Sequence, residues 1–290
     1  GMENLLFLLH QMLGEKVSIG IENPVYKNAY AILKELNFKI HPIAMDESGM
    51  CVEELEQTDA NLAYVTPAHQ YPTGVIMPVG RRSQLLRWAK KDPDRYIIED
   101  DYDSELRLSG QPIPTLQSMD VSDKVIYMNT FTKTLASTVR ISYMILPREL
   151  VQQYYKKLSF YSCTVSNFEQ YTLAKFIEEG YFEKHINRLR NYYHNKRNTI
   201  VETIKKSRLN QYVSISGEEA GVHFLMKIET KRPQEQLMEN AKAQGIKLSP
   251  LSAYYKENRE EIQNTYVMNY SSIELEKIEK VVTRLVKCCE

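Results

Sequence analysis

Lys133 stands in a run of hydroxyl side chains that could together hold a phosphate. The hydroxyl residues of this run are Thr130, Thr132, Thr134, Ser137 and Thr138. Arg140 comes after them and opens the next predicted strand. Hydroxyls and a guanidinium beside a lysine form charge-assisted hydrogen bonds with phosphate oxygens, but a threonine-rich loop also serves to cap helices. The segment alone leaves both interpretations open.

A second chemical segment comes directly after the apolar pair Ile97 and Ile98. It reads Glu99, Asp100, Asp101, Tyr102 and Asp103. Carboxylates packed at a strand end repel one another, so a purely structural role is less satisfactory than usual. The alternative is a solvated acidic loop.

A third segment, VTPAHQYPTG at residues 65–74, carries His69, Gln70 and Tyr71 on an extended turn. Two prolines and a glycine enforce that turn, and a structural turn is its commonest explanation. All three segments lie at the ends of predicted strands. Ligands of open parallel sheets collect at the carboxyl ends of strands, so these segments are the candidate site.

Strands and helices alternate in the first half of the chain. Helices are predicted at 5–13, 25–36 and 80–91, and strands at 17–21, 38–43, 62–67, 96–100 and 125–129. Such alternation predicts an α/β fold with three layers, in which helices cover both faces of a mostly parallel sheet. We assign residues 1–190 to this large domain.

The pattern changes after Pro147 to long helices, and residues 181–206 are predicted to connect two domains. We expect residues 191–290 to form a smaller α+β domain. Its predicted strands are 222–228, 246–248 and 266–270, and its helices 234–244 and 273–287. Cys288 and Cys289 end the last helix and are expected to fray, while Trp88 is expected to be half buried.

Composition excludes several classes of function. Lys and Arg together number 37, as do Asp and Glu, so the net charge is zero and DNA binding by this chain itself is not expected. No apolar stretch reaches the length of a membrane span. The six histidines lack i+3 or i+4 partners, so no metal site is expected. Four cysteines without C-x-x-C spacing indicate a reducing cytoplasm.

The order of motifs closely resembles pyridoxal-phosphate enzymes of the aspartate aminotransferase fold (fold type I, aminotransferase class I/II). It specifically resembles the aminotransferase-like domain of MocR-type regulators of the GntR family. The resemblance runs through IENPVYKNAY, VTPAHQYPTG, YIIEDDYDSELR, VIYMNTFTKTLASTVRISYMILP, EEAGVHFL and GIKLSPLSAYY. It spans nearly the whole chain, and the segment from FTKT to RISYMILP is its most specific part.

The resemblance implies a role for each of seven residues toward pyridoxal 5'-phosphate. Lys133 forms the Schiff base and, once freed by an incoming amine, shuttles a proton. Asp100 pairs with the pyridine nitrogen, which keeps the cofactor an effective electron sink. Tyr102 hydrogen-bonds the phenolic oxygen, and these three are the implied catalytic residues. Tyr26 stacks on the cofactor face. The phosphate positions are matched by Thr130, Thr132 and Arg140.

The chain departs from the family pattern in its last predicted strand. Related aminotransferases clamp the substrate carboxylate there with an arginine, but residues 265–270 read TYVMNY. A charge-assisted hydrogen bond is worth about 1.5–3 kcal/mol, so its loss weakens binding of α-amino acids. In the PTG turn, Tyr71 replaces the asparagine of many relatives, and its contact is left unassigned.

Two functions are implied by the resemblance. In the first, the chain is the effector-sensing part of a regulator and forms an external aldimine with an amine or amino acid without turnover. In the second, it is an aminotransferase that transfers an amino group to a 2-oxo acid. A cofactor-free structural domain is a third, less favoured interpretation. The family's glycine-containing phosphate loop and winged-helix domain precede the helix with which this chain opens, so DNA binding is expected only through such an N-terminal domain. The expected assembly is a homodimer.

Overall fold

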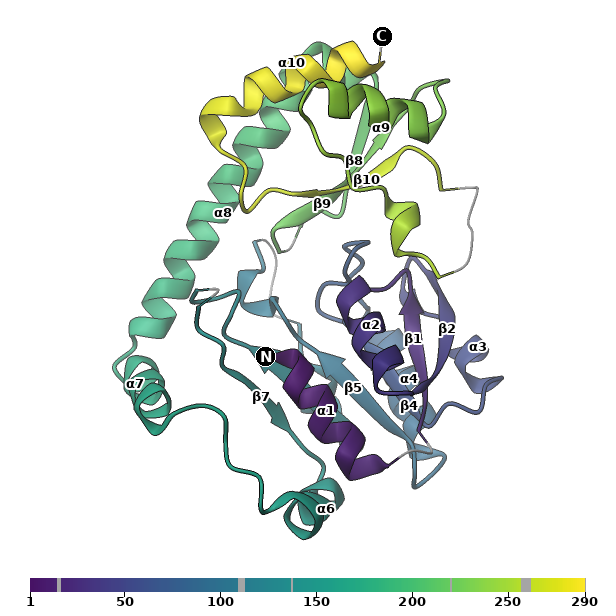
Figure 1. Cartoon of the computed structure of the whole chain (residues 1–290), viewed down its shortest axis with the longest axis vertical. Helices are drawn as coiled ribbons and strands as arrows, with labels where there is room; N and C mark the ends of the chain where they lie inside the picture. The colour runs from purple at the N-terminus through teal and green to yellow at the C-terminus, as the bar shows by residue number, and fades with distance from the viewer. Residues whose placement is uncertain (15–16, 109–112, 137, 220, 257–261, 290) are drawn as a thin grey trace.

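The computed structural model describes residues 1–14, 17–108, 113–136, 138–219, 221–256 and 262–289. Its largest feature is a seven-stranded sheet of order β3-β2-β1-β4-β5-β6-β7 (Figure 1). The strands are β1 (Ser18–Asn23), β2 (Lys39–Asp46), β3 (Gly49–Met50), β4 (Leu62–Val65), β5 (Tyr96–Asp100), β6 (Val125–Thr130) and β7 (Ser142–Ile145). The five inner strands are parallel, and the two edge strands pair antiparallel. The expected mostly parallel sheet is confirmed.

Helices cover both faces of this sheet because its inner strands are apolar on both sides. Ile98 packs in one buried cluster, while its neighbour Ile97 packs in the other. The first face is covered by α1 (Met2–Leu13), α2 (Lys27–Glu35) and α6 (Arg148–Leu158). The second is covered by α3 (Val52–Glu56), α4 (Val79–Lys90) and α5 (Leu116–Met119). The three-layer fold predicted from the sequence is confirmed.

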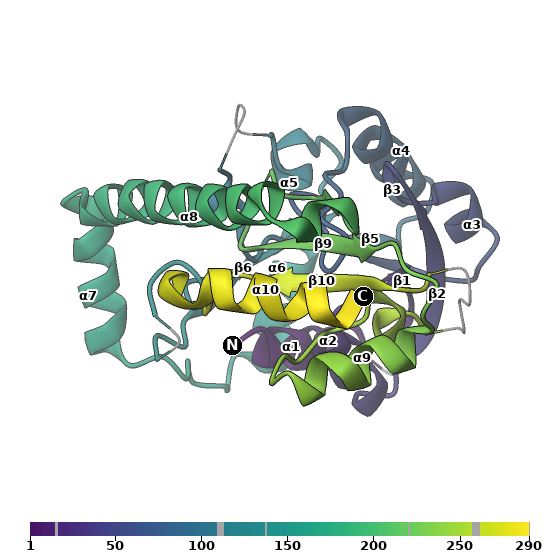
Figure 2. The same cartoon turned by 90° about the horizontal axis from the view of Figure 1, so that it is seen from above.

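A smaller α+β unit forms the second half of the molecule. Helix α7 (Asn167–Glu178) leads into α8 (Tyr181–Lys206), which runs along one side of the molecule to the second sheet (Figure 1). That sheet is antiparallel, in the order β10 (Thr265–Asn269), β9 (His223–Ile228) and β8 (Val213–Ser216). Helices α8, α9 (Gln234–Ala243) and α10 (Ile278–Cys289) gather around it in one apolar cluster (Figure 2).

Short 3-10 helices complete the described elements. They are Ser104–Leu106, Arg208–Gln211, Leu251–Tyr254 and Leu275–Lys277.

Three local predictions were wrong. Residues 246–248 form no strand, because the chain approaches β10 only at Ser249 and Pro250, and a proline has no N–H for a ladder. The third strand of the small sheet is instead β8, whose serines weaken its apolar signal.

The other two local errors concern burial. Cys288 and Cys289 do not fray but are 1% and 7% exposed within the apolar cluster of the small unit. Trp88 is fully buried under the large sheet rather than half buried. A single side chain's burial depends on the neighbours that packing brings to it, which periodicity along one helix does not reveal.

The register of the parallel strands brings the three chemical segments to one edge. Val65 pairs with Glu99, and Asp100 pairs with Met128. The carboxyl ends of β4, β5 and β6 therefore lie side by side, and the loops that leave these strand ends face the same opening.

Candidate functional site

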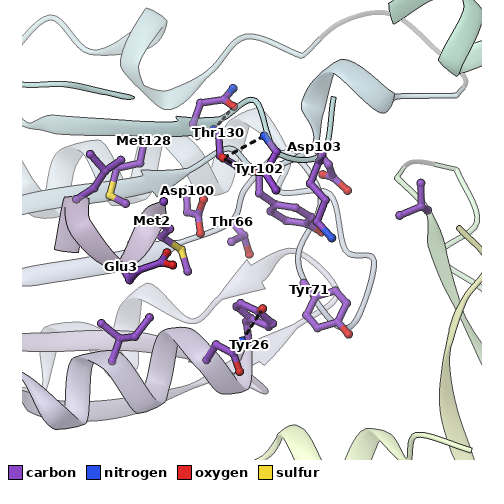
Figure 3. A pocket seen from close by; sticks show the side chains of 18 of the residues that line it. Met2, Glu3, Tyr26, Thr66, Tyr71, Asp100, Tyr102, Asp103, Met128 and Thr130 are labelled. Atoms are coloured by element: carbon purple, nitrogen blue, oxygen red, sulfur yellow. Dashed lines mark hydrogen bonds between the residues drawn. The ribbon is translucent and has the colours of Figure 1, made fainter. Parts of the chain in front are cut away.

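All seven residues singled out in the sequence line one cavity of about 780 Å³. It lies between the carboxyl edge of the large sheet, the start of α1 and α2, and the small sheet, and Figure 3 shows it from close by. The lining residues are Asp100, Tyr102, Thr130, Thr132, Lys133, Arg140 and Tyr26, joined by Thr66, Tyr71, Asp103, His223, Asn269 and others.

Asp100 ends β5 and is 8% exposed at the cavity wall. The buried hydroxyl of Tyr64, on the neighbouring strand β4, donates a short hydrogen bond to its Oδ2. Burial raises the pKa of Asp100 to about 7, an effect that the Tyr64 bond opposes and the nearby Asp101 and Asp103 carboxylates reinforce. Asp100 is thus poised to hold a proton, or to give one up, near neutral pH.

Lys133 lies in the turn that leaves β6, where its exposed side chain faces the cavity. Hydroxyl groups hold this turn in place. Thr130 Oγ1 donates to Thr132 Oγ1 at 3.0 Å, and Thr132 Oγ1 donates to the Val139 carbonyl at 3.1 Å. The lysine is therefore presented on a fixed loop beside two hydroxyls. Ser137 lies outside the described residues.

Arg140 lines the cavity on the far side of this turn. One of its nitrogens forms an ion pair with Glu3 of α1 at 2.9 Å, and both side chains are about half exposed. A guanidinium carries five N–H donors, so a single carboxylate leaves most of them available to an anion. The Glu3 carboxylate also competes for that anion.

Tyr26 caps the start of α2, and its side chain is 38% exposed at the cavity. Its hydroxyl accepts a hydrogen bond from Asn28 Nδ2 at 3.0 Å. Its ring meets that of Tyr71 edge to face, with centroids 5.6 Å apart. Figure 3 shows both rings at the same side of the cavity, opposite Asp100 and Thr66.

Tyr102 belongs to a buried network between the large sheet and the small unit. Its hydroxyl donates to the His69 carbonyl at 2.9 Å and also lies 3.2 Å from His69 Nδ1. His69 Nδ1 is 3.0 Å from Asp103 Oδ2. Gly221, which comes just before β9, packs directly on His69 and Asp103. A Cβ at this position would collide with both side chains. The network therefore depends on how the two units are packed.

Sequence reasoning did not assign several residues of the cavity wall. The PTG turn contributes Tyr71, whose hydroxyl is 3.1 Å from that of Tyr254. Gln70 turns away and donates to the Pro24 carbonyl. His223 and Asn269 reach the cavity from the small sheet. In the sequence, only their positions in the segments EEAGVHFL and TYVMNY could have pointed to a place in the site. Their part in the cavity is set by tertiary packing.

Two negative findings apply to the described part of the chain. It holds no group of three or more His, Cys, Asp or Glu side chains that could bind a metal ion. Within it, no helix is both long and apolar enough to cross a membrane.

Residues 1–285 match the family described as aminotransferase class I and II. The uncharacterized HTH-type transcriptional regulator YdeL of Bacillus subtilis is 42% identical over 87% of this chain and 54% of its own length. The probable rhizopine catabolism regulatory protein MocR of Rhizobium meliloti is 33% identical over 88% of this chain and 52% of its own. The chain thus spans about half the length of these curated relatives.

Solved structures agree with the fold. The kynurenine aminotransferase of Pyrococcus horikoshii superposes with a TM-score of 0.84 and 27% identity, over all of this chain and 73% of its own. A multiple substrate aminotransferase of Thermococcus profundus gives the same TM-score at 29% identity, with the same two coverages. The site, the fold and these likenesses agree. The chain belongs to the aminotransferase class I and II family and is homologous to MocR and other HTH-type transcriptional regulators.

Proposed function

We propose that this chain is the ligand-sensing part of a transcriptional regulator and that it holds pyridoxal phosphate in the cavity through Lys133. One observation carries the proposal: the seven residues implied by the sequence come from separate stretches of chain and line a single cavity. A structural loop lysine has no need of a buried carboxyl, a tyrosine and two hydroxyls around one opening.

The donor set fits the chemical groups of pyridoxal phosphate. Lys133 offers an amine for its aldehyde. Asp100, at the end of β5, offers a carboxyl for its ring nitrogen. The free N–H groups of Arg140 offer donors for its phosphate, and the hydroxyls of Thr130 and Thr132 would turn from their present acceptors toward it.

Bound there, the cofactor supplies an electron sink for bonds to an amine's α-carbon. Lys133 Nζ would hold the cofactor by a covalent bond to its aldehyde carbon, with loss of one water. Asp100, with its pKa raised to about 7, would hold a proton between its carboxyl and the ring nitrogen. Tyr102 contributes a hydroxyl that donates to the His69 carbonyl in this structure and that would serve the phenolic oxygen instead.

A sensor is favoured over a transaminase by the neutral residues of the last strand and by four curated relatives of 30% to 42% identity that carry regulator names. We propose that an amine or amino acid is the effector and that DNA is bound through a part of the protein that this chain does not cover. We also propose a homodimer. The four free cysteines suit a cytoplasmic location.

We propose that the boundary between a large domain (1–190) and a small one (191–290) falls within α8. Arg190 of this helix donates to the Glu105 carbonyl, in the turn that follows β5, and its Ile200 and Ile204 pack in the apolar cluster of the small unit.

Absorbance titration with pyridoxal phosphate tests the covalent bond. The wild type should develop a band in the violet that borohydride removes, and mass spectrometry should place the reduced adduct on Lys133. Lys133→Ala should show no such band. Lys205→Ala, which removes an exposed lysine in the last turn of α8, is the matched control and should behave as wild type. A band of equal strength in Lys133→Ala contradicts the proposal.

Product analysis separates the sensor from the enzyme. Amines are added to the loaded protein, and release of 2-oxo acid is measured over many equivalents. A sensor should change its spectrum without accumulating 2-oxo acid, whereas multiple turnovers would establish the aminotransferase.

A further inference from the structure

The turn at residues 65–74 touches the implied catalytic residues through a side chain to which the function proposed above gives no part. Gln70 donates to a backbone carbonyl of another loop, and the Tyr71 hydroxyl meets a tyrosine of the small unit. His69 instead lies against Tyr102, which lines the cavity. Of the three polar side chains HQY in this turn, His69 is therefore the one placed to act on the site.

Two contacts join His69 to Tyr102. The Tyr102 hydroxyl donates to the His69 carbonyl at 2.9 Å, and its oxygen lies 3.2 Å from His69 Nδ1. A phenol has a single hydrogen, and the carbonyl takes it, so the contact with Nδ1 is attractive only when Nδ1 carries a hydrogen of its own. This holds whether the imidazole as a whole is neutral or doubly protonated. Nδ1 is therefore a donor to the Tyr102 oxygen.

Asp103 fixes the orientation of the His69 ring. Its Oδ2 lies 3.0 Å from the same Nδ1, and the His69 and Asp103 side chains are 1% and 2% exposed. A carboxylate oxygen accepts, so Asp103 and the Tyr102 oxygen share the hydrogen of Nδ1. Gly221 packs against both side chains of this pair and leaves no room for a Cβ. The ring is thus held by a carboxylate on one side and by the backbone of the small unit on another.

Other titratable side chains surround the same group. The ring of His223, on β9, lies 4.4 Å from the His69 ring, centroid to centroid. The side chains that act on Tyr102 electrostatically are Asp103, Asp100 and Tyr71. Figure 3 shows Tyr102 and Asp103 on the same side of the cavity. A variant of His69 leaves all of these groups in place, so a change that it causes reports the loss of the imidazole.

Resting on the proposed function, we infer that His69, anchored by Asp103, is a positioning residue for the Tyr102 hydroxyl. Its Nδ1–H holds the Tyr102 oxygen in place while the phenol hydrogen turns from the His69 carbonyl to the phenolic oxygen of the cofactor. The hydroxyl then keeps one bond that it accepts and exchanges one that it donates, so the turn leaves no bond unmade. Without the imidazole, the phenol keeps only the carbonyl and has no second group to hold it at the cavity.

This positioning has a measurable consequence for the loaded protein. A Tyr102 hydroxyl that donates to the phenolic oxygen draws negative charge from that oxygen and weakens its hold on a proton shared with the nitrogen of Lys133. The hold becomes stronger when the hydroxyl is misplaced. Loss of the His69 ring should therefore raise the pH midpoint at which the visible band of the loaded protein changes.

Absorbance of the loaded protein against pH tests the inference. His69→Phe keeps a ring and the backbone carbonyl but removes the donor, and should raise the midpoint by about one pH unit, the effect of one lost hydrogen bond. His69→Asn keeps an amide N–H near the position of Nδ1 and should return the midpoint to within about half a unit of wild type. His194→Phe, on α8 and outside the described cavity lining, is the matched control and should keep the wild-type midpoint.

A double variant separates positioning from a general change in packing. Tyr102→Phe should raise the midpoint at least as far as His69→Phe does. Because His69 acts through the Tyr102 hydroxyl, His69→Phe should add almost no shift when Tyr102→Phe is already present. A midpoint unchanged in His69→Phe, or a full additional shift in the double variant, overturns the inference.

Nitrogen NMR of the cofactor-free wild type tests the hydrogen bond without any variant having to fold. The ¹⁵N shift of His69 Nδ1 should report a protonated nitrogen at about pH 7, and an unprotonated Nδ1 overturns the inference. The Lys133 adduct is measured before each pH series. Its absence from the wild type counts against the proposed function, whereas an adduct that forms but shows the wrong midpoints counts against this inference alone.

Discussion

Asp100 illustrates how one residue acquires its chemistry from its neighbours. The sequence marks it as one acid among several, and the structure distinguishes it by a buried phenol, Tyr64, that donates to its Oδ2. Tyr64 lies on β4, and the parallel register of β4 with β5 brings the two side chains together. The bond stabilises the ionised carboxylate, against the larger effect of burial.

Replacement of Tyr64 by Phe should raise the pKa of Asp100 further, by about one unit, because a hydrogen bond to a charged group contributes about 1.5–3 kcal/mol. The carboxyl ¹³C shift of Asp100 in the cofactor-free protein measures this. Tyr96→Phe, which removes a phenol that donates to Glu149 on the same face, is the control. A titration of Asp100 that is the same in Tyr64→Phe and wild type would show that the phenol has no such effect.

Glu22 predicts a pH dependence of stability. It accepts hydrogen bonds from the Thr66 backbone and hydroxyl, yet burial raises its pKa from 4.5 to about 7. Because the folded state binds this proton more tightly, its stabilisation is complete below about pH 4.5 and is lost as pH rises through about 7. The shift corresponds to about 3 kcal/mol.

Urea unfolding of cofactor-free protein checks this at about pH 5.5, which lies within the window between the two pKa values, and at about pH 8, which lies above it. Wild type should be less stable at the higher pH. Glu22→Gln should lose the part of the difference that comes from Glu22, because its amide does not ionise, while Glu99 and Asp100, whose pKa values are also raised to about 7, keep theirs. Glu47→Gln, a substitution at an exposed turn acid, serves as the control. An equal pH dependence in Glu22→Gln and wild type would falsify the assignment.

At the scale of helices and strands, one buried arginine connects the second helical layer to the loops that line the site. Arg82 of α4 is 1% exposed and donates to the carbonyls of Met77, Pro114 and Pro67 at 2.9, 2.8 and 2.7 Å. Glu99, 3.8 Å away, accepts from the backbone N–H groups that begin α5. The Pro67 carbonyl belongs to the VTP segment, so α4 fixes the loop that carries His69.

Arg82→Met should destabilise the fold by about 3–5 kcal/mol, because it removes a buried guanidinium that donates to three carbonyls and that is the cation beside Glu99. Equilibrium urea denaturation measures the change. Arg87→Met removes an exposed arginine of the same helix and should cost little. A cost for Arg82→Met no larger than that for Arg87→Met would mean that water replaces the lost donors.

The elements themselves were largely predictable. The strand at 96–100 and the helix at 181–206 are reproduced with the predicted bounds, because long apolar periodicity is a strong local signal. β8 and the segment 246–248 were not, since short half-polar segments become strands only when a neighbour offers a ladder.

At the scale of the whole molecule, a band of apolar side chains is left uncovered on the outer helices. No residue of α7 is buried, although the helix is capped by Ser166 and Glu169. The exposed residues of this band are Val151, Tyr155, Phe160, Tyr161, Phe168, Tyr171, Ile177 and Tyr181. Monomeric proteins rarely expose so many large apolar side chains on neighbouring segments of the chain, which supports the proposed homodimer.

The double substitution Phe168→Asp with Tyr171→Asp should convert the dimer to a monomer, because it places two charges where apolar surface would be buried. Light scattering after size exclusion measures the mass. Val121→Asp, at an exposed apolar residue of the loop before β6, is the control and should remain dimeric. A wild type that is already monomeric, or a double variant that stays dimeric, contradicts this interface.

The sequence by itself determined the fold class, the order of most elements and the seven residues that line the cavity. The fold class and the order of elements arise from local periodicity, and parallel strands bring the loops at their carboxyl ends to one edge of the sheet. The seven residues were implied by the resemblance of the motifs to the aminotransferase family. The tertiary structure alone decided which groups lie together: Tyr64 with Asp100, His69 with Asp103, and His223 beside Asn269 in the ladder of β9 and β10. Hydrogen bonds and burial act over a few ångströms, so partners that are far apart in the chain are chosen only when the two sheets have packed together.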